Sequence, residues 1–268
     1  MIDTAGSPSA PALPALRTGR RPFILGKLFN FVLRDFLRSP WPFINLILLV
    51  GVHALFFKYE STQSHFFGIQ YAIIALLAAI NTGAIFSRAH RAETYAILAR
   101  PVRRATLAAA MLLVAWLVAA LVHLLSTLAD VIRFSPLLNP GADIPAWRNP
   151  LTYLIGSLPI LVMALAVVGF VALMSSYVST SEQRLGIFAV VALFVMSFDP
   201  NNFPIEALRP AVERVPPLLA PAAGAIRYAT VGPDDPIASF SLAVLVGYAL
   251  LLILMVLWFS SQREVILD

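Results

Sequence analysis

Repeated apolar stretches of about 20 residues constrain the fold of this chain more than any other feature. A helix needs about 20 apolar residues to cross the roughly 30 Å hydrocarbon core of a bilayer. The stretches that reach or approach this length are 41–57, 66–86, 105–129, 151–176, 185–198 and 237–260. The fifth is short, so it needs a continuation beyond Asp199 or a locally thinner bilayer. The sequence therefore predicts an all-α integral membrane protein with about six transmembrane helices.

Composition argues in the same direction and against a soluble enzyme. The chain is 59% hydrophobic and 12% charged, and its mean hydropathy is +0.83, whereas soluble domains carry about 25% charged residues. Six spans in 268 residues leave too little length for a folded soluble domain, so 22–268 is predicted to form one membrane domain. Residues 1–21 are rich in Pro, Ala and Ser and lack the apolar core of a secretory signal, which indicates a disordered cytoplasmic tail.

The distribution of basic residues predicts the orientation of the spans. With the N-terminus inside, 13 of the 19 Lys and Arg residues fall in cytoplasmic segments and 6 fall on the other side. This positive-inside bias places both termini in the cytoplasm. Although the pI is near 9.9, the charges punctuate apolar runs instead of gathering on a soluble unit, which argues against nucleic acid as a partner. Lys and Arg at span ends contact membrane lipids instead.

The segment before the first span, 22–39, has the pattern of an amphipathic helix. At about 100° per residue, its polar and apolar residues fall on opposite arcs. The polar arc holds Lys27, Asn30, Arg34, Asp35 and Arg38, and the apolar arc holds Leu25, Phe29, Val32 and Phe36, with Phe31 as the one misfit. Such a helix lies in the headgroup plane instead of crossing the bilayer. Pro40 and Pro42 are expected to end it and turn the chain into the first span.

The linker between the second and third spans, 87–104, is the most distinctive segment. It reads SRAHRAETYAILARPVRR and sets Tyr95, Ile97 and Leu98 among five arginines. Pro101 is expected to end a short helix here, because a residue before proline disfavours the α region. On the residues alone two interpretations remain open: an anchor that lies on the membrane, and a docking site for a cytoplasmic partner.

A second irregular segment, 199–236, precedes the last span. It contains eight prolines and an apolar but broken middle, VPPLLAPAAGAIRYAT. Such a stretch can enter the bilayer as broken half-helices where it packs on protein. A plain surface loop is the competing interpretation.

No constellation in the sequence predicts a catalytic residue or a metal site. The chain has no Cys, and none of His53, His65, His90 and His123 lies three or four residues from another. The two histidines inside spans, His53 and His123, are expected to hydrogen-bond to neighbouring carbonyls. No phosphate-binding glycine loop is present, so any ATP that drives this protein must bind to a different polypeptide.

Polar residues near the span ends have simpler expected roles. Asp130 and Asp199 fall at the ends of the third and fifth spans, and we interpret them as solvated interfacial residues in preference to a proton-relaying pair. Asn81 and Thr82, followed by Gly83, suit hydrogen bonding and close approach between helices.

Taken together, these features resemble the permease subunits of type-two ATP-binding-cassette (ABC) exporters, over roughly 21–268. The shared features are the elbow helix at 22–39, six spans with both ends inside, and a broken apolar segment before the last span. The linker residues 91–104, RAETYAILARPVRR, are similar to the family's arginine and glutamate, its Gly-Thr-Leu-Glu-like step, its Leu-Leu pair and its closing Pro-Val-Ser-Arg, although the usual Gly before Thr94 is missing. Arg103 stands where the family usually has Ser.

The resemblance implies a transporter subunit of the bacterial cytoplasmic (inner) membrane that is not itself an enzyme. It would pair with a second permease copy or a homologous permease and dock an ABC ATP-binding subunit. ATP and Mg would sit on that subunit, and no cofactor is expected on this chain. The residues implied for the ATPase-docking coupling helix are Arg91, Glu93, Tyr95, Ile97, Leu98 and Arg100. Those implied for the membrane-surface elbow are Lys27, Phe29, Arg34, Phe36 and Arg38.

The scarcity of polar residues inside the spans bears on the cargo. It fits an apolar or lipid-like substrate, or a path formed only where two permeases meet. It fits equally well the alternative function, a non-transporting membrane scaffold or accessory subunit that anchors a cytoplasmic complex.

Overall fold

The computed structural model describes residues 23–57, 62–89, 104–134, 147–177 and 216–262, and every regular element within them is an α-helix. The helices are α1 (Phe23–Leu37), α2 (Trp41–Phe56), α3 (Gln63–Ala89), α5 (Arg104–Arg133), α6 (Pro150–Tyr177), α9 (Pro216–Val231) and α10 (Pro236–Gln262). The prediction of an all-α protein is confirmed for these residues.

Four of these helices, α3, α5, α6 and α10, are long and apolar enough to cross a membrane. They correspond to the predicted spans 66–86, 105–129, 151–176 and 237–260, and each extends a few residues beyond the predicted bounds. A fifth crossing is possible where α1 and α2 act as a bent pair. By itself α2 has 16 residues and is about 24 Å long. The predicted span 185–198 and the tail 1–21 lie outside the described residues.

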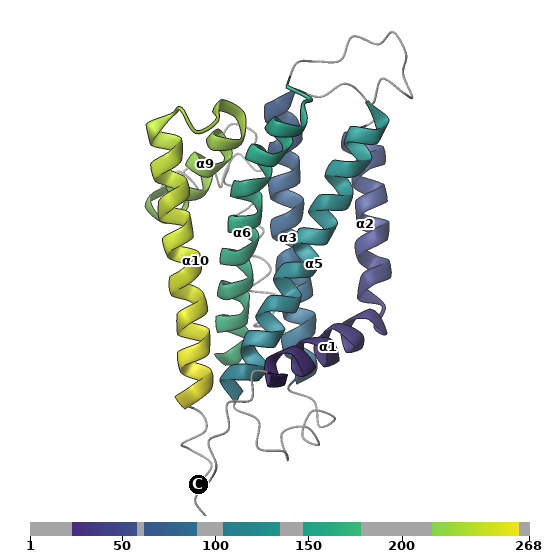
Figure 1. Cartoon of the computed structure of the whole chain (residues 1–268), viewed down its shortest axis with the longest axis vertical. Coiled ribbons are helices and arrows are strands. Elements are labelled where there is room, and N and C mark those ends of the chain that lie inside the picture. Colours follow the sequence, from purple (N-terminus) through teal and green to yellow (C-terminus); the bar gives the residue numbers. More distant parts are fainter. Residues whose placement is uncertain (1–22, 58–61, 90–103, 135–146, 178–215, 263–268) are drawn as a thin grey trace, which may run out of the picture.

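The junction of α1 and α2 forms an elbow with a bend of 64°. The α1 helix ends as Ser39 N–H donates to the Phe36 carbonyl at 3.0 Å. Pro40 and Pro42 then start α2, since a proline in the first turn removes no hydrogen bond that the helix needs. In Figure 1, α1 lies across the lower end of the bundle while the other long helices stand upright. The chain therefore bends at the prolines, where the sequence predicts the boundary.

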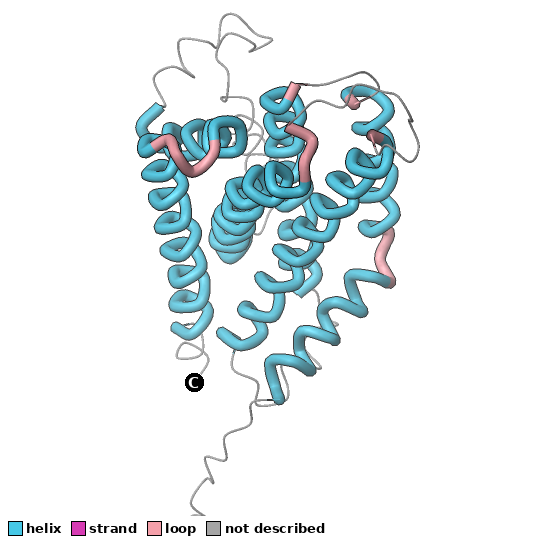
Figure 2. The backbone as a smooth tube through the Cα atoms, turned by 45° about the horizontal axis from the view of Figure 1, so that its top comes forward, coloured by secondary structure: helices cyan, strands magenta, loops and turns pink. Residues whose placement is uncertain are grey.

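The end of the bundle that carries α1 is called the α1 end here, and the opposite one the far end. The α2 and α5 helices run from the α1 end to the far end, and α3, α6 and α10 run back (Figures 1 and 2). The α9 helix lies at the far end beside the start of α10. The α6 helix thus finishes at the α1 end, whereas α9 lies at the far end.

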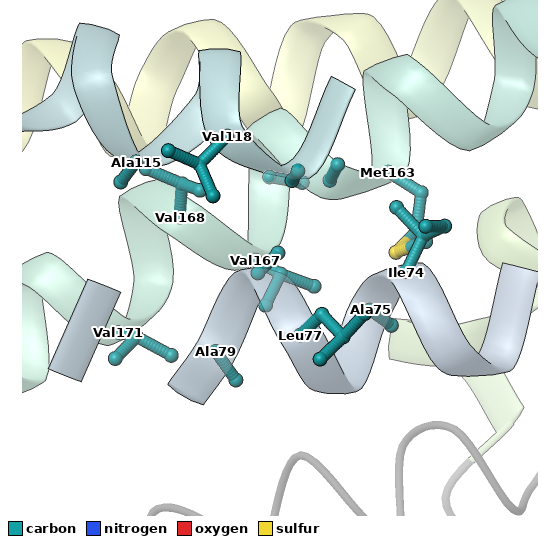
Figure 3. Packing of buried hydrophobic residues seen from close by; sticks show 14 of the residues in the cluster. Ile74, Ala75, Leu77, Ala79, Ala115, Val118, Met163, Val167, Val168 and Val171 are labelled. Carbon is teal, nitrogen blue, oxygen red and sulfur yellow. The ribbon is translucent and has the colours of Figure 1, made fainter. Parts of the chain in front are cut away.

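Small and branched apolar residues fill the space between α3, α5 and α6 in the half of the bundle nearer the α1 end. Figure 3 shows Ile74 of α3 beside Met163 of α6, and Val168 of α6 beside Ala115 and Val118 of α5. The α6 and α10 helices approach each other closely at Gly169, where an added Cβ would lie 2.9 Å from Leu252 Cβ. This is the small-residue packing by which helices associate in lipid.

A helical hairpin, α9 followed by α10, completes the far end. Gly232 ends α9 with φ +90°, a left-handed conformation that favours glycine, and its N–H bonds the Tyr228 carbonyl at 2.9 Å. Asp235 then caps α10, accepting from the Ile237 N–H at 2.9 Å, and pairs with Arg227 of α9 at 2.7 Å. Part of the predicted irregular segment 199–236 is therefore a packed helix and not a plain surface loop.

Candidate functional site

The predicted docking residues of the linker lie outside the described part of the chain. The helices on either side of the linker are described. Arg91, Glu93, Tyr95, Ile97, Leu98 and Arg100 belong to the undescribed segment 90–103. Its neighbours are the end of α3 at Ala89 and the start of α5 at Arg104, and both lie at the α1 end. The linker is thus attached at the same end of the bundle as the elbow helix.

The elbow helix α1 packs against α5 through one stripe of its surface. Leu28, Val32 and Phe36 are buried, and their spacing of four residues places them on one face. Phe29 is half-buried beside them. Of the predicted apolar arc, Val32 and Phe36 belong to this buried stripe, whereas Leu25 is 41% exposed.

The cationic arc of α1 lies on the exposed side of the helix. Lys27, Arg34 and Arg38 are all exposed. Phe31 lies within that arc and is 46% exposed, as the sequence pattern predicted for the misfit residue. The α1 helix thus has one face that holds α5 and one cationic face with a single aromatic side chain, which suits contact with anionic headgroups.

A buried polar cluster occupies the half of α5 and α6 nearer the far end. On α5, His123, Ser126, Thr127 and Asp130 are buried and spaced at i, i+3, i+4 and i+7, so they share one face. The sequence contains this signal as H-x-x-S-T-x-x-D, which the predictions did not use. Its position within a membrane-crossing helix makes it a functional lead, since intramembrane polar groups are costly and usually serve a purpose.

Asp130 is the charged centre of this cluster, and its interpretation as a solvated residue is wrong. Its side chain is 1% exposed, because α6 and the residues before it cover the end of α5. The Tyr153 hydroxyl of α6 donates a short hydrogen bond to Asp130 Oδ2. Arg148 Nε lies 3.9 Å from the same oxygen, with its side chain 2% exposed. The proposed partner carboxylate, Asp199, lies outside the described residues.

Arg148 makes its closest contacts with aromatic rings. The guanidinium carbon lies 3.1 Å from the Phe134 ring centroid and 4.9 Å from that of Trp147, an arrangement in which the ring quadrupole attracts the cation. By the geometry of the described residues, none of its three guanidinium nitrogens has a hydrogen-bond partner. The ion pair with Asp130, at 3.9 Å, is longer than the contact of the guanidinium with the Phe134 ring.

Further hydrogen bonds continue the cluster toward the middle of the bundle. His123 Nε2 lies 2.9 Å from Ser157 Oγ, which donates to the Tyr153 carbonyl at 2.6 Å. On the other side, Gln70 of α3 donates a short bond to Ser126. The expectation of a carbonyl partner is thus wrong for His123, which meets a hydroxyl because Ser157 of α6 faces it. It is right for His53, whose Nδ1 lies 3.3 Å from the Leu49 carbonyl.

Aromatic side chains enclose this cluster at the far end. The ring of Phe66 is fully buried, with its centroid 5.2 Å from that of Phe67, 5.7 Å from Tyr153 and 5.9 Å from Trp147. Gly156 of α6 provides the space for Phe67, because any Cβ at this position would overlap its ring. These rings shield Tyr153 and Asp130 from the surroundings.

A second polar contact ties α2 to the bundle. Asn45 Nδ2 donates to Asn81 Oδ1 at 3.0 Å, and both side chains are buried. This confirms the prediction of helix–helix hydrogen bonding for Asn81. Thr82 instead bonds the Ala78 carbonyl of its own helix at 2.6 Å. Within the described ranges, no three His, Asp or Glu side chains come together as metal ligands would.

Comparison with known proteins gives no family for this chain. No protein-family model, no curated protein sequence and no solved structure matches it.

Proposed function

We propose that this chain is the permease subunit of an ABC transporter, coupled through the linker at 88–104 to a separate ATP-binding subunit. It would form the translocation path as a dimer with a second copy or a homologous permease, and export an apolar or lipid-like substrate. The observation that carries the proposal is the elbow: α1 bends by 64° from α2 and packs on α5 at the end where the linker is attached.

The elbow contact gives a mechanical reason for this assignment. A partner that pushes on the linker acts directly on Arg104, the first residue of α5. Since Leu28, Val32 and Phe36 bind α1 to α5, α1 would move with α5 and carry α2 through the bend. ATP binding then shifts the subunit between arrangements only if the ATP-binding subunit contacts one arrangement more favourably than the other.

The packing of the subunit also favours a translocation path between two subunits. It argues against a path through the interior of a single subunit. The core of α3, α5 and α6 toward the α1 end is densely apolar (Figure 3). In contrast, α2 and α10 expose long apolar faces that include Leu46, Ile47, Leu250 and Leu254. Such faces contact lipid or a second permease, and an apolar seam suits a lipid-like cargo.

The docking role of the linker can be tested by charge substitution. Replacing Ile97 and Leu98 with Asp places two carboxylates in the predicted apolar contact, and the conservative variant Ile97→Val/Leu98→Ile, which keeps the contact apolar, is the matched control. The tagged chain is purified in mild detergent from its native host, and the vanadate-sensitive ATPase activity of the co-purified material is measured.

The expected result is loss of a co-purified ATPase with the Asp double variant and its retention with the conservative variant Ile97→Val/Leu98→Ile. Unchanged association and turnover in the Asp double variant would refute the docking claim. A companion that binds the native chain and hydrolyses no ATP would instead favour the scaffold function.

A further inference from the structure

A proline divides α6 into two parts that are held in different ways. Pro159 lies inside this helix, and because it has no N–H it cannot bond the Ile155 carbonyl as other residues at this position would. Sharp kinks in helices occur mostly at prolines, and membrane helices tolerate them. Residues 150–158, on the far-end side of Pro159, are called the far arm here, and 160–177 the near part.

The near part of α6 is fixed by buried packing. Ile160 and Met163 are fully buried, and Trp116 of α5 donates from Nε1 to the Leu161 carbonyl at 3.1 Å. At Gly169 the near part is in close contact with α10. A movement of this part would expose buried apolar surface, which is unfavourable in water and leaves voids in lipid. The near part therefore stays with the bundle.

The far arm is held by polar bonds to α5 and by the aromatic cluster at the far end. Its Tyr153 hydroxyl donates to Asp130, and its Ser157 Oγ lies 2.9 Å from His123 Nε2. Bonds to water can replace such polar bonds at little net cost, whereas buried apolar contacts have no such replacement. On the outer face of the far arm, Leu154 is 70% exposed. The far arm is therefore the part of α6 that can move at the lower cost.

The ion pair across this contact is poorly satisfied while the far arm lies against α5. The side chains of Asp130 and Arg148 are 1% and 2% exposed and lie 3.9 Å apart, and the rings of Phe134 and Trp147 lie against the guanidinium. Among the described residues, neither Asp130 Oδ1 nor any guanidinium nitrogen has a hydrogen-bond partner. A buried ion pair without further hydrogen bonds recovers little of the free energy that its desolvation costs.

We propose that the far arm is a flap that swings away from α5 about Pro159, and that the Asp130–Arg148 pair favours opening because both charges then gain hydration. Asp130 lies three residues before the end of α5 and Arg148 two residues before α6, so a small displacement brings them to the far side of the bundle. The far arm has nine residues and is about 14 Å long. A rotation of about 20° at the proline therefore moves its tip by about 5 Å.

This structure shows the flap closed, with the aromatic rings over the ion pair. The near part and the apolar core below it keep their contacts when the flap opens, so the change is confined to the far end. The inference goes beyond the proposed function, because it concerns a movement within one subunit and is measured without an ATP-binding subunit.

Spin labels can follow the far arm, because the chain has no cysteine of its own. The reporting pair is Leu128→Cys on α5 with Leu154→Cys on the far arm, both on exposed faces. The control pair is Leu113→Cys with Ser175→Cys, on the same two helices toward the α1 end. The labelled chain is placed in lipid nanodiscs, and the distance distribution of each pair is measured by electron paramagnetic resonance spectroscopy.

The reporting pair is expected to show two distances that differ by about 5 Å, and the control pair a single distance. Asp130→Asn/Arg148→Met leaves no charge to hydrate and should shift the populations toward the short distance, on the order of tenfold. Arg148→Met alone leaves a buried carboxylate without its cation and should shift them toward the long distance by about as much. If both variants favour the long distance, the ion pair only holds the far arm shut and the proposal is wrong. Unchanged populations in both variants, or an equal change at the control pair, would overturn it as well.

A second variant leaves the ion pair intact and covers the case in which the charge variants do not fold. Pro159→Ala restores the missing N–H and stiffens the helix, so the long distance should disappear from the otherwise native chain. Pro150→Ala is the matched control, because a proline at the first position of a helix removes no hydrogen bond that the helix needs. A long distance that persists in Pro159→Ala, or that disappears equally in Pro150→Ala, would rule out the hinge. A native chain with the short distance alone would rule out the flap itself.

Discussion

The contact between Gly156 and Phe67 provides a quantitative test of the packing at the far end. A Cβ on Gly156 would lie 2.7 Å from Phe67 Cε2 and still nearer to two other ring atoms. To reach an ordinary 3.4 Å contact the ring would have to move 0.7 Å or more. It has little room to do so, because Phe67 is 1% exposed and its centroid lies 5.2 Å from that of Phe66 and 6.4 Å from that of Trp147.

Gly156→Ala is therefore expected to destabilise the chain although alanine is the better helix former. Overpacking a filled core costs about 1–3 kcal/mol, and the helix-propensity gain of about 1 kcal/mol offsets part of it. The difference, a net loss of up to about 2 kcal/mol, corresponds to a fall in Tm of up to about 5 °C for a chain of this size. Thermal unfolding followed by tryptophan fluorescence reports on this region directly, because Trp147 lies in the same aromatic cluster.

Two further variants separate the clash from other effects of the substitution. Gly68→Ala is the matched control one residue from Phe67, since nothing lies within 4 Å of its added Cβ, and its Tm should stay constant or rise. Phe67→Leu removes ring atoms, so the double variant Gly156→Ala/Phe67→Leu should be more stable than the sum of the single changes predicts. If Gly156→Ala has the same Tm as Gly68→Ala, the argument from ring overlap is wrong. It is also wrong if the effects of Gly156→Ala and Phe67→Leu on stability are additive.

Two other substitutions test polar contacts by the same thermal assay. Asn45→Leu leaves the buried Asn81 amide without its partner and should destabilise by about 1–2 kcal/mol, whereas Asn45→Leu/Asn81→Leu should recover part of the loss. Equal Tm values for the single and double variants would contradict a direct Asn45–Asn81 bond. Asp235→Ala removes the cap of α10 and should cost about 1 kcal/mol. Arg227→Ala keeps that cap and should cost less, because the Arg227 side chain is 57% exposed, and an equal loss would show that the ion pair outweighs the cap.

The sequence carried enough information to locate the crossing helices, because the length of an apolar run is a local property. Residues 105–129 and 237–260 must be long helices in lipid whatever lies beside them, since backbone groups find no partners there outside a helix. The bend between α1 and α2 was likewise predicted from Pro40 and Pro42. The linker residues around Ile97 and Leu98 remain a sequence-based prediction.

What only the tertiary structure decided is the environment of individual side chains. Asp130 lies at the end of a span, and its sequence neighbours do not reveal that Tyr153 and Arg148 cover it. The sequence shows the helical spacing of the polar residues from His123 to Asp130. It does not show which helices pack against the face that carries them. Burial depends on which helix packs on which face, and that is fixed by contacts between residues far apart in the chain, such as Phe67 with Gly156.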